Sequence, residues 1–506
     1  MVSGHILKTL VAACVLCGIL GGQLYAQEEP ALPEGLGPAS DTGDEPALPE
    51  GLGPATGESD EPGLPEGLES GKSTQGEDEP ALPEGIGEEV DKPDEAETGS
   101  GDRGGLPEGL TGYFEVRGGL RTREDPYQRD GSIGETRLQL EYEKLMDKWG
   151  FKVTADFLYD DVISHHRIHL DEGRGWLDLR EANFSWTPID FADVKVGRQI
   201  LTWGTGDLVF INDLFPKDWN SFFIGRDNEY LKAPSDAVKV SLFSDVANLD
   251  VVYTPAFNAD RYIDGRQISY YNGVLGRRAG RDAIVSVDRP NEWFREDEIA
   301  LRVYKNLSGL ELAGYGYRGF WKSPAGMNVV TGRATFPDLS VYGFSARTTV
   351  GKGIGHVEVG YYDSTDDSSG NNPFVPNSEW RFLVGYEQEV VTDLTVGIQY
   401  YVELMEDYGA YRRTLPAGTP ARDEDRHVVT LRLTKLMQKG NLRLSLFAYY
   451  SPSDDDAYLR PNVHYKLDDH WSAEVGANVF IGEDAHTFFG QFERDSNVYV
   501  AMRYGF

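Results

Sequence analysis

The amino-acid sequence predicts an all-β fold, a transmembrane antiparallel β-barrel over residues 111–506 that follows a disordered, acidic, Pro- and Gly-rich tract. Three observations predict it. Apolar side chains recur at every second position, and terse connections alternate with long polar ones. After residue 26, no apolar run approaches the roughly 18 to 20 residues that a spanning helix needs. The segments give about 18 strands of about 9 to 12 residues, with about 16 strands as the second choice.

The period-two pattern is clearest near 394–403 and 442–449. In the first segment, Leu394, Val396 and Ile398 alternate with polar or small residues. This period places successive side chains on opposite faces of a strand. A half-buried soluble sheet would also alternate, so the spacing of the breaks between strands is the stronger evidence.

Terse connections are expected near 147–150, 188–192, 245–248, 307–308, 351–353, 390–393, 437–440 and 468–470. Long polar connections are expected at 124–135, 163–175, 204–235, 258–296, 321–338, 364–378, 406–425 and 482–495. Outer-membrane barrels show this asymmetry, with tight turns at one rim and long loops at the other. Because lipid offers no hydrogen-bond partners, the sheet must close.

Tryptophans fall near the predicted strand ends, as two interfacial girdles require. Trp149, Trp186 and Trp471 lie beside tight turns. Trp203, Trp321 and Trp380 lie beside long loops. We therefore expect the first group at one membrane interface and the second at the other.

The chain stops at Tyr504-Gly505-Phe506, with Val498, Val500 and Met502 on one face of the last strand. This ending resembles the terminal strand of Gram-negative outer-membrane barrels. The resemblance implies an outer-membrane location, contact with outer-membrane lipid, and recognition of Phe506 by the barrel-assembly machinery. The N-terminal tract would then lie in the periplasm.

The N-terminus predicts a secretory signal peptide over residues 1–26. Lys8 ends a positive region, 9–20 is apolar, and Leu24-Tyr25-Ala26 supplies a cleavage site. A lipoprotein signal at Cys14 is the alternative. The only cysteines are Cys14 and Cys17, so cleavage after Ala26 removes both and excludes disulfides and covalent haem. We predict no cofactor.

The tract at 27–110 carries much of the chain's net charge of -35 and repeats the motif Leu-Pro-Glu-Gly. It is too poor in apolar side chains to offset the entropy of ordering. It is either a self-repelling spacer or a multivalent array that docks a periplasmic partner. The acidity of the chain argues against nucleic acid as a partner.

A barrel of this size is roughly 35 Å across, too wide for wall side chains to fill. Loops 204–235 and 258–296 are therefore the candidate constrictions. The first carries six aromatic residues, which are costly in water, so we expect it in the lumen or over the mouth. Its predicted constriction residues, with the adjoining wall arginine, are Arg198, Asp207, Asp213, Lys217, Asp218 and Trp219.

The segment 196–218 resembles porin-like channels of unassigned substrate and alginate-export-type channels. The resemblance implies a channel and says little about its cargo. Arg198 either faces Asp207 or Asp213 at the constriction or forms a structural pair that fixes loop to wall.

Arginines on the inward parity form the predicted pore lining. They are Arg117, Arg121, Arg347, Arg381, Arg432, Arg443, Arg460 and Arg503. Carboxylates share this parity, so cross-strand ion pairs that stiffen a wet lumen are one interpretation. The other is an arginine track that attracts anions.

The sequence thus predicts a porin-like channel that passes small, possibly anionic, solutes passively or with weak selectivity. A scaffold or export barrel that works with an envelope complex for lipid, polysaccharide or electron transfer is the alternative. A hydrolase at the rim is a third hypothesis. We predict no enzyme, because no Gly-x-Ser-x-Gly occurs, and no metal site, because loop histidines such as His165 and His166 are usually surface residues.

Overall fold

The computed structural model of the protein describes residues 107–163 and 167–506. The predicted signal peptide and nearly all of the acidic tract lie outside the described residues. Within them, no helix has the length and apolarity required to cross a membrane.

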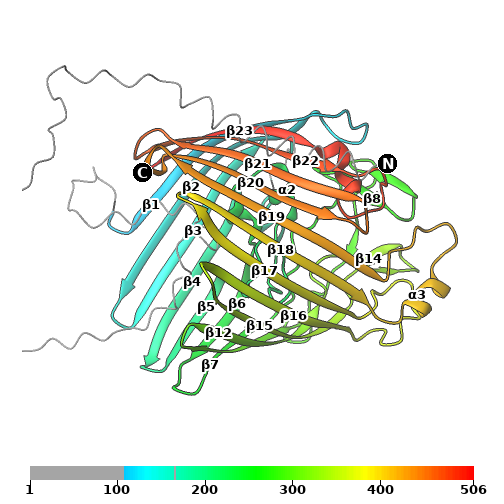
Figure 1. Ribbon diagram of the computed structural model, residues 1–506, viewed down its shortest axis with the longest axis horizontal. Helices are drawn as coiled ribbons and strands as arrows, with labels where there is room; N and C mark the ends of the chain where they lie inside the picture. The colour runs from blue at the N-terminus through cyan, green and yellow to red at the C-terminus, as the bar shows by residue number, and fades with distance from the viewer. Residues whose placement is uncertain (1–106, 164–166) are drawn as a thin grey trace, which may run out of the picture. The chain divides into compact units, whose positions relative to one another are not determined.

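Eighteen strands in the described residues form one antiparallel sheet (Figure 1). They are β1 (Leu110–Arg121), β2 (Gly131–Met146), β3 (Trp149–Asp160), β4 (Leu177–Ile189), β5 (Ala192–Ile200), β6 (Pro234–Leu242), β7 (Asn248–Thr254), β11 (Glu298–Leu307), β12 (Leu310–Phe320), β15 (Asp338–Val350), β16 (Gly353–Ser364), β17 (Glu379–Val391), β18 (Leu394–Met405), β19 (Asp425–Met437), β20 (Leu442–Ser451), β21 (Asp456–Lys466), β22 (Trp471–Ile481) and β23 (Asn497–Gly505). Each pairs with its neighbours along the chain, and β1 also pairs with β23, so the sheet closes. The prediction of 18 strands is confirmed.

The remaining described elements lie in the connections. They are the strands β8 (Tyr270–Asn272), β9 (Arg277–Ala279), β10 (Val287–Asp288), β13 (Gly326–Asn328) and β14 (Arg333–Thr335), the helices α2 (Trp219–Ile224) and α3 (Tyr408–Thr414), and the 3-10 turns η1 (Leu170–Glu172), η2 (Asn228–Leu231), η3 (Gln438–Gly440) and η4 (Gly490–Asp495). The short and long connections occur where the sequence predicts them, and the structure shows one further short connection that was not predicted. The turn 452–455 between β20 and β21 is short although it lies at the long-loop rim.

Two irregular strands have local explanations. The register between β3 and β4 shifts between Thr154 and Ala155, so Arg180 and Glu181 are both buried. This β-bulge accounts for the irregular alternation at 177–187. Pro461 lies in β21, and the pairing with β22 skips it while keeping the same register on both sides, as expected for a residue without an N–H donor.

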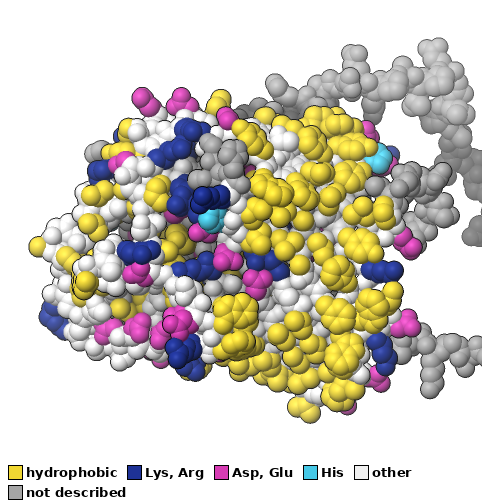
Figure 2. All heavy atoms as spheres, turned by 180° about the vertical axis from the view of Figure 1, so that it is seen from behind, with side chains coloured by type: hydrophobic (Ala, Val, Ile, Leu, Met, Phe, Trp, Pro, Cys, Tyr) yellow, Lys and Arg dark blue, Asp and Glu magenta, His cyan; other side chains and the backbone are white. Residues whose placement is uncertain are grey.

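The outer wall is apolar and the inner wall is polar, as lipid on one side requires. On β23, Val500 is 56% exposed, whereas the adjacent Tyr499 and Ala501 are buried. Apolar side chains cover the wall as a broad belt, and charged side chains gather toward the long-loop end (Figure 2). The predicted alternation therefore holds for the described barrel.

The prediction of two tryptophan girdles holds for four of the six tryptophans. Trp149, Trp186 and Trp471 are exposed at the tight-turn rim, and Trp380 is exposed at the other. Trp203 and Trp321, however, pack against buried residues inside the barrel. A residue near the end of a strand can point to either face of the wall, because side chains alternate between the faces only while the backbone keeps its strand geometry.

Candidate functional site

The connection 201–233 between β5 and β6 folds into the barrel and is called the constriction loop below. Ile211, Phe222, Phe223 and Ile224 of this loop are almost completely buried. The loop contains α2, which begins where the Asp218 carboxylate accepts the Ser221 N–H at 2.8 Å. The prediction that these aromatics pack into the lumen is confirmed.

Gly225 ends α2 in the left-handed conformation, with φ of 87°. A Cβ at this position would lie 2.3 Å from the ring of Tyr499 on β23. Glycine is therefore needed both for the backbone angle and for the close approach of the loop to the wall. Arg117 of β1 donates to the Gly225 carbonyl at 2.6 Å and fixes the same turn.

The first half of the constriction loop is held by Glu358 of β16. Its buried carboxylate accepts hydrogen bonds from Thr205 Oγ1 at 2.9 Å, from the Gly206 N–H at 2.8 Å and from Asn212 Nδ2 at 3.0 Å. It also accepts from the Thr205 N–H. Hydrogen bonds to a charged acceptor are the strong ones, so Glu358 is the main attachment of this half.

Two glycines on the wall make room for the same segment. Gly343 of β15 lies opposite Gly360 of β16 in the ladder. A Cβ on Gly343 would lie 1.7 Å from Asn212 Oδ1, and one on Gly360 would lie 2.7 Å from the Ile211 side chain. The loop therefore rests directly on the backbone of these strands.

Asp207 and Leu208 connect the loop to three further strands. Its carboxylate pairs with Arg432 of β19, with one contact of 2.5 Å. Its backbone N–H and carbonyl both bond Gln399 of β18 at 2.8 Å. The next residue, Leu208, accepts from Tyr449 of β20 at 2.7 Å.

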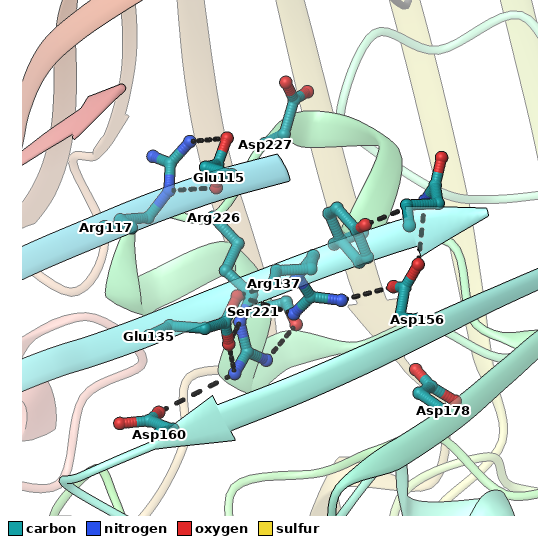
Figure 3. Close-up of polar contacts among 12 residues, drawn as sticks. Glu115, Arg117, Glu135, Arg137, Asp156, Asp160, Asp178, Ser221, Arg226 and Asp227 are labelled. Carbon is teal, nitrogen blue, oxygen red and sulfur yellow. Dashed lines mark hydrogen bonds and ion pairs between the residues drawn. The ribbon is translucent and has the colours of Figure 1, made fainter. Parts of the chain in front are cut away.

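The second half of the loop binds the opposite wall through a buried charged network (Figure 3). Arg226 bonds Glu135 of β2 at 2.6 Å, and its guanidinium lies 3.8 Å from Asp160 of β3. The Tyr230 ring lies between the guanidiniums of Arg137 and Arg180, at 4.2 and 4.3 Å. The loop thus crosses the lumen from one wall to the other.

The predicted constriction residues separate into different contacts. Arg198 pairs with Asp236 at 2.9 Å and donates to the carbonyls of Leu179 and Leu170, so the alternative in which it faces Asp207 or Asp213 is wrong. Gly197 beside it lies within β5 and has a φ of 119°, a backbone conformation that favours glycine. The structural interpretation of Arg198 fits these contacts.

Of the other predicted constriction residues, Asp213, Lys217 and Asp218 are buried and Trp219 is partly buried. Asp213 pairs with Lys217 at 2.9 Å. Asp218 lies 3.4 Å from Arg261 of the β7–β11 connection, and Trp219 donates to Asp260 at 3.1 Å. Burial raises the pKa of Asp260, although hydrogen bonds to its carboxyl oppose this effect. These groups hold the loop together rather than line open water.

Half of the predicted arginine track is neutralised by ion pairs. The members in ion pairs are Arg117, Arg381, Arg432 and Arg503, and Arg121 donates to Asp495 at 3.2 Å. Arg460 donates to Asn228, Arg347 lies opposite Glu311, and Arg443 lies opposite His464. These contacts favour the ion-pair interpretation for this part of the wall.

An arc of cations lies on β5, β6 and β11. Lys195 and Lys239 lie directly opposite each other in the ladder. Lys239 and Arg302 each approach Asp250 to 3.9 Å. The side chains of Lys239 and Arg302 are 20% and 27% exposed, whereas that of Asp250 is 1% exposed. The accessible charge of the arc is therefore positive.

Sequence reasoning did not assign Gln399 to the site, and it placed Glu358 on the inner wall without a partner in the loop. No local pattern says which wall residues meet a loop more than a hundred residues away. Among the described residues, no group of three or more His, Cys, Asp and Glu side chains could hold a metal. His165 and His166 lie outside the described residues.

No family model matches the chain, and no curated protein matches it. Solved outer-membrane porins are similar in structure. Pseudomonas aeruginosa OccD3 is 12% identical, with a TM-score of 0.44 over 79% of this chain and 92% of that one. Acinetobacter baumannii OccAB3 is 12% identical, with a TM-score of 0.45 over 78% and 99%. Salmonella typhi OmpF, solved with daunomycin, is 9% identical, with a TM-score of 0.39 over 78% and 97%.

Proposed function

We propose that the protein is a porin-like channel of a Gram-negative outer membrane that passes small anionic solutes passively or with weak selectivity. The observation that carries this proposal is a closed barrel with an apolar outer wall, a charged inner wall and a loop that narrows the lumen. A wall lined with charge is suited to water and solutes. The seam supports the location, because Phe506 closes it through two backbone hydrogen bonds to Gly112.

The preference for anions rests on the arc of Lys195, Lys239 and Arg302. Each cation of the arc is more exposed than the carboxylate that it approaches. Lys195 is 35% exposed and Glu181 is 11% exposed, for example. A solute in the lumen therefore meets the positive member of each pair first, and charged rings of this kind set selectivity.

Recordings of the purified protein in planar bilayers test the proposal. In a KCl gradient, we expect a reversal potential that indicates preference for chloride. Changing Lys239→Gln and Arg302→Gln together should weaken that preference, while Lys435→Gln, at the tight-turn end of β19, should leave it unchanged. A cation-selective or non-conducting barrel contradicts the proposal, and a non-conducting barrel that co-purifies with an envelope complex supports a scaffold instead.

A further inference from the structure

Residues 260–281 of the β7–β11 connection, called the strap below, extend along the long-loop rim to the other side of the seam. Arg261 binds Asp178 of β4 through two contacts of 2.7 Å. Gln267 donates to the carbonyl of Ser132 on β2 at 2.9 Å. The backbone N–H of Tyr271 in β8 donates to the side chain of Gln491, in the β22–β23 connection, at 3.1 Å. The strap thus reaches from β7 to the connection before β23 (Figure 1).

The strap is fastened at Ser269 between two buried carboxylates from two other connections. The Ser269 hydroxyl donates to Asp125 Oδ2 at 2.6 Å. Its backbone N–H donates to Asp495 Oδ2 at 3.1 Å. Arg121, at the end of β1, donates to Asp495 Oδ1 at 3.2 Å and to the carbonyl of Gln267. Three connections therefore meet at one buried point.

The charge at this point is unbalanced. Asp125 and Asp495 are 7% and 2% exposed, and Arg121 is the cation that contacts Asp495. Glu493, on the same connection as Asp495, binds Arg123 and Arg278 instead. Burial raises the pKa of Asp495 to about 7, with Arg121 opposing that rise and Asp125 adding to it.

A cavity of about 100 Å³ lies beneath the strap. The strap contributes Asp264, Arg266 and Gln267 to its lining, and the constriction loop contributes Asp218 and Arg226. The cavity therefore lies between the outer connections and the constriction loop. Movement of the strap would change access to the constriction from the long-loop side.

We propose that the junction of Ser269 with Asp125 and Asp495 is a pH-sensitive latch that holds the strap over this cavity and releases it when Asp495 ionises beside Asp125. This regulation rests on the proposed channel function. In the latched state both carboxylates bind Ser269, only Asp495 contacts Arg121, and both are buried. In the released state water solvates both carboxylates, so the released state favours ionisation.

The direction with pH follows from proton linkage. The latched state holds the Asp495 proton more tightly than the released state, where the pKa returns toward its ordinary 3.8. The latch is therefore fully stable below that ordinary value and is lost as pH rises through about 7. Between these limits the ratio of latched to released molecules falls by about tenfold per pH unit.

Hydrogen exchange of the strap tests the latch without reference to transport. The full-length protein is compared at pH 5 and pH 7.5, with rates corrected for the intrinsic pH dependence of exchange. We expect protection of residues 264–281 to fall on the order of tenfold or more at the higher pH. Asp495→Asn has no proton to lose, so its protection should not vary with pH. Asp484→Asn, an exposed aspartate on the same connection, should behave like the wild type.

Asp125→Asn is the second variant, because it removes the charge while the amide oxygen can still accept the Tyr127 N–H and the amide NH2 can donate to the Ser269 hydroxyl in place of the bond that Asp125 accepts. We expect the midpoint of the protection change to shift to lower pH. Equal strap protection at both pH values in the wild type, or an unchanged pH dependence in Asp495→Asn, would overturn the latch. Bilayer recordings separate the two proposals. If the barrel conducts ions but hydrogen exchange of the strap does not depend on pH, only the latch is refuted. If exchange of the strap depends on pH but the barrel does not conduct, only the channel is refuted.

Discussion

Removal of the Glu358 carboxylate should release the first half of the constriction loop. Glu358→Ala deletes the hydrogen bonds to Thr205, Gly206 and Asn212. A hydrogen bond to a charged group contributes about 1.5–3 kcal/mol. Three such bonds lost give a cost of about 4.5–9 kcal/mol, which is at least roughly a thousandfold in the opening equilibrium of the loop.

Hydrogen exchange of residues 203–214 measures this opening directly, and single-channel current should become noisier as the loop samples new positions. Glu311→Ala is the matched control, since Glu311 lies on the inner wall opposite Arg347 and makes no described hydrogen bond to the loop. Glu358→Gln should give a smaller effect because one oxygen remains. If the alanine variants at positions 358 and 311 exchange at the same rate, Glu358 is not the attachment inferred above.

Three further perturbations address the packing of the loop and the closure of the seam. Gly343→Ala should displace Asn212 at a cost of about 1–3 kcal/mol, seen as faster exchange of the loop, and unchanged exchange would contradict the close approach. Phe223→Ala should remove about 3–5 kcal/mol and lower the thermal unfolding temperature, whereas Phe382→Ala on the lipid face should lower it less. Deletion of Phe506 removes both terminal bonds to Gly112 and should reduce the amount of folded barrel in the outer membrane, and a normal yield would exclude a role in assembly.

The wall of the barrel was predictable because its determinant is local. Lipid requires apolar side chains on the outer face of every strand. The alternation of an outward apolar residue such as Val500 with an inward residue such as Tyr499 therefore repeats in each strand that crosses the membrane. Tight turns and long loops then give the strand count without any knowledge of partners. Phe506 and the residues beside it could be assigned to the last strand for the same reason.

The sequence by itself determined the barrel, its approximate strand count and the loop that enters it, since each follows from patterns within a few residues. Only the tertiary structure decided which wall residues hold that loop and which tryptophans turn inward. Glu358 and Glu311 have the same parity and the same charge, yet one meets the loop and the other does not. Barrel closure brings residues together that are far apart in the chain, and many inward charges compete for each partner. The selection therefore depends on three-dimensional fit, such as the space that Gly343 leaves for Asn212.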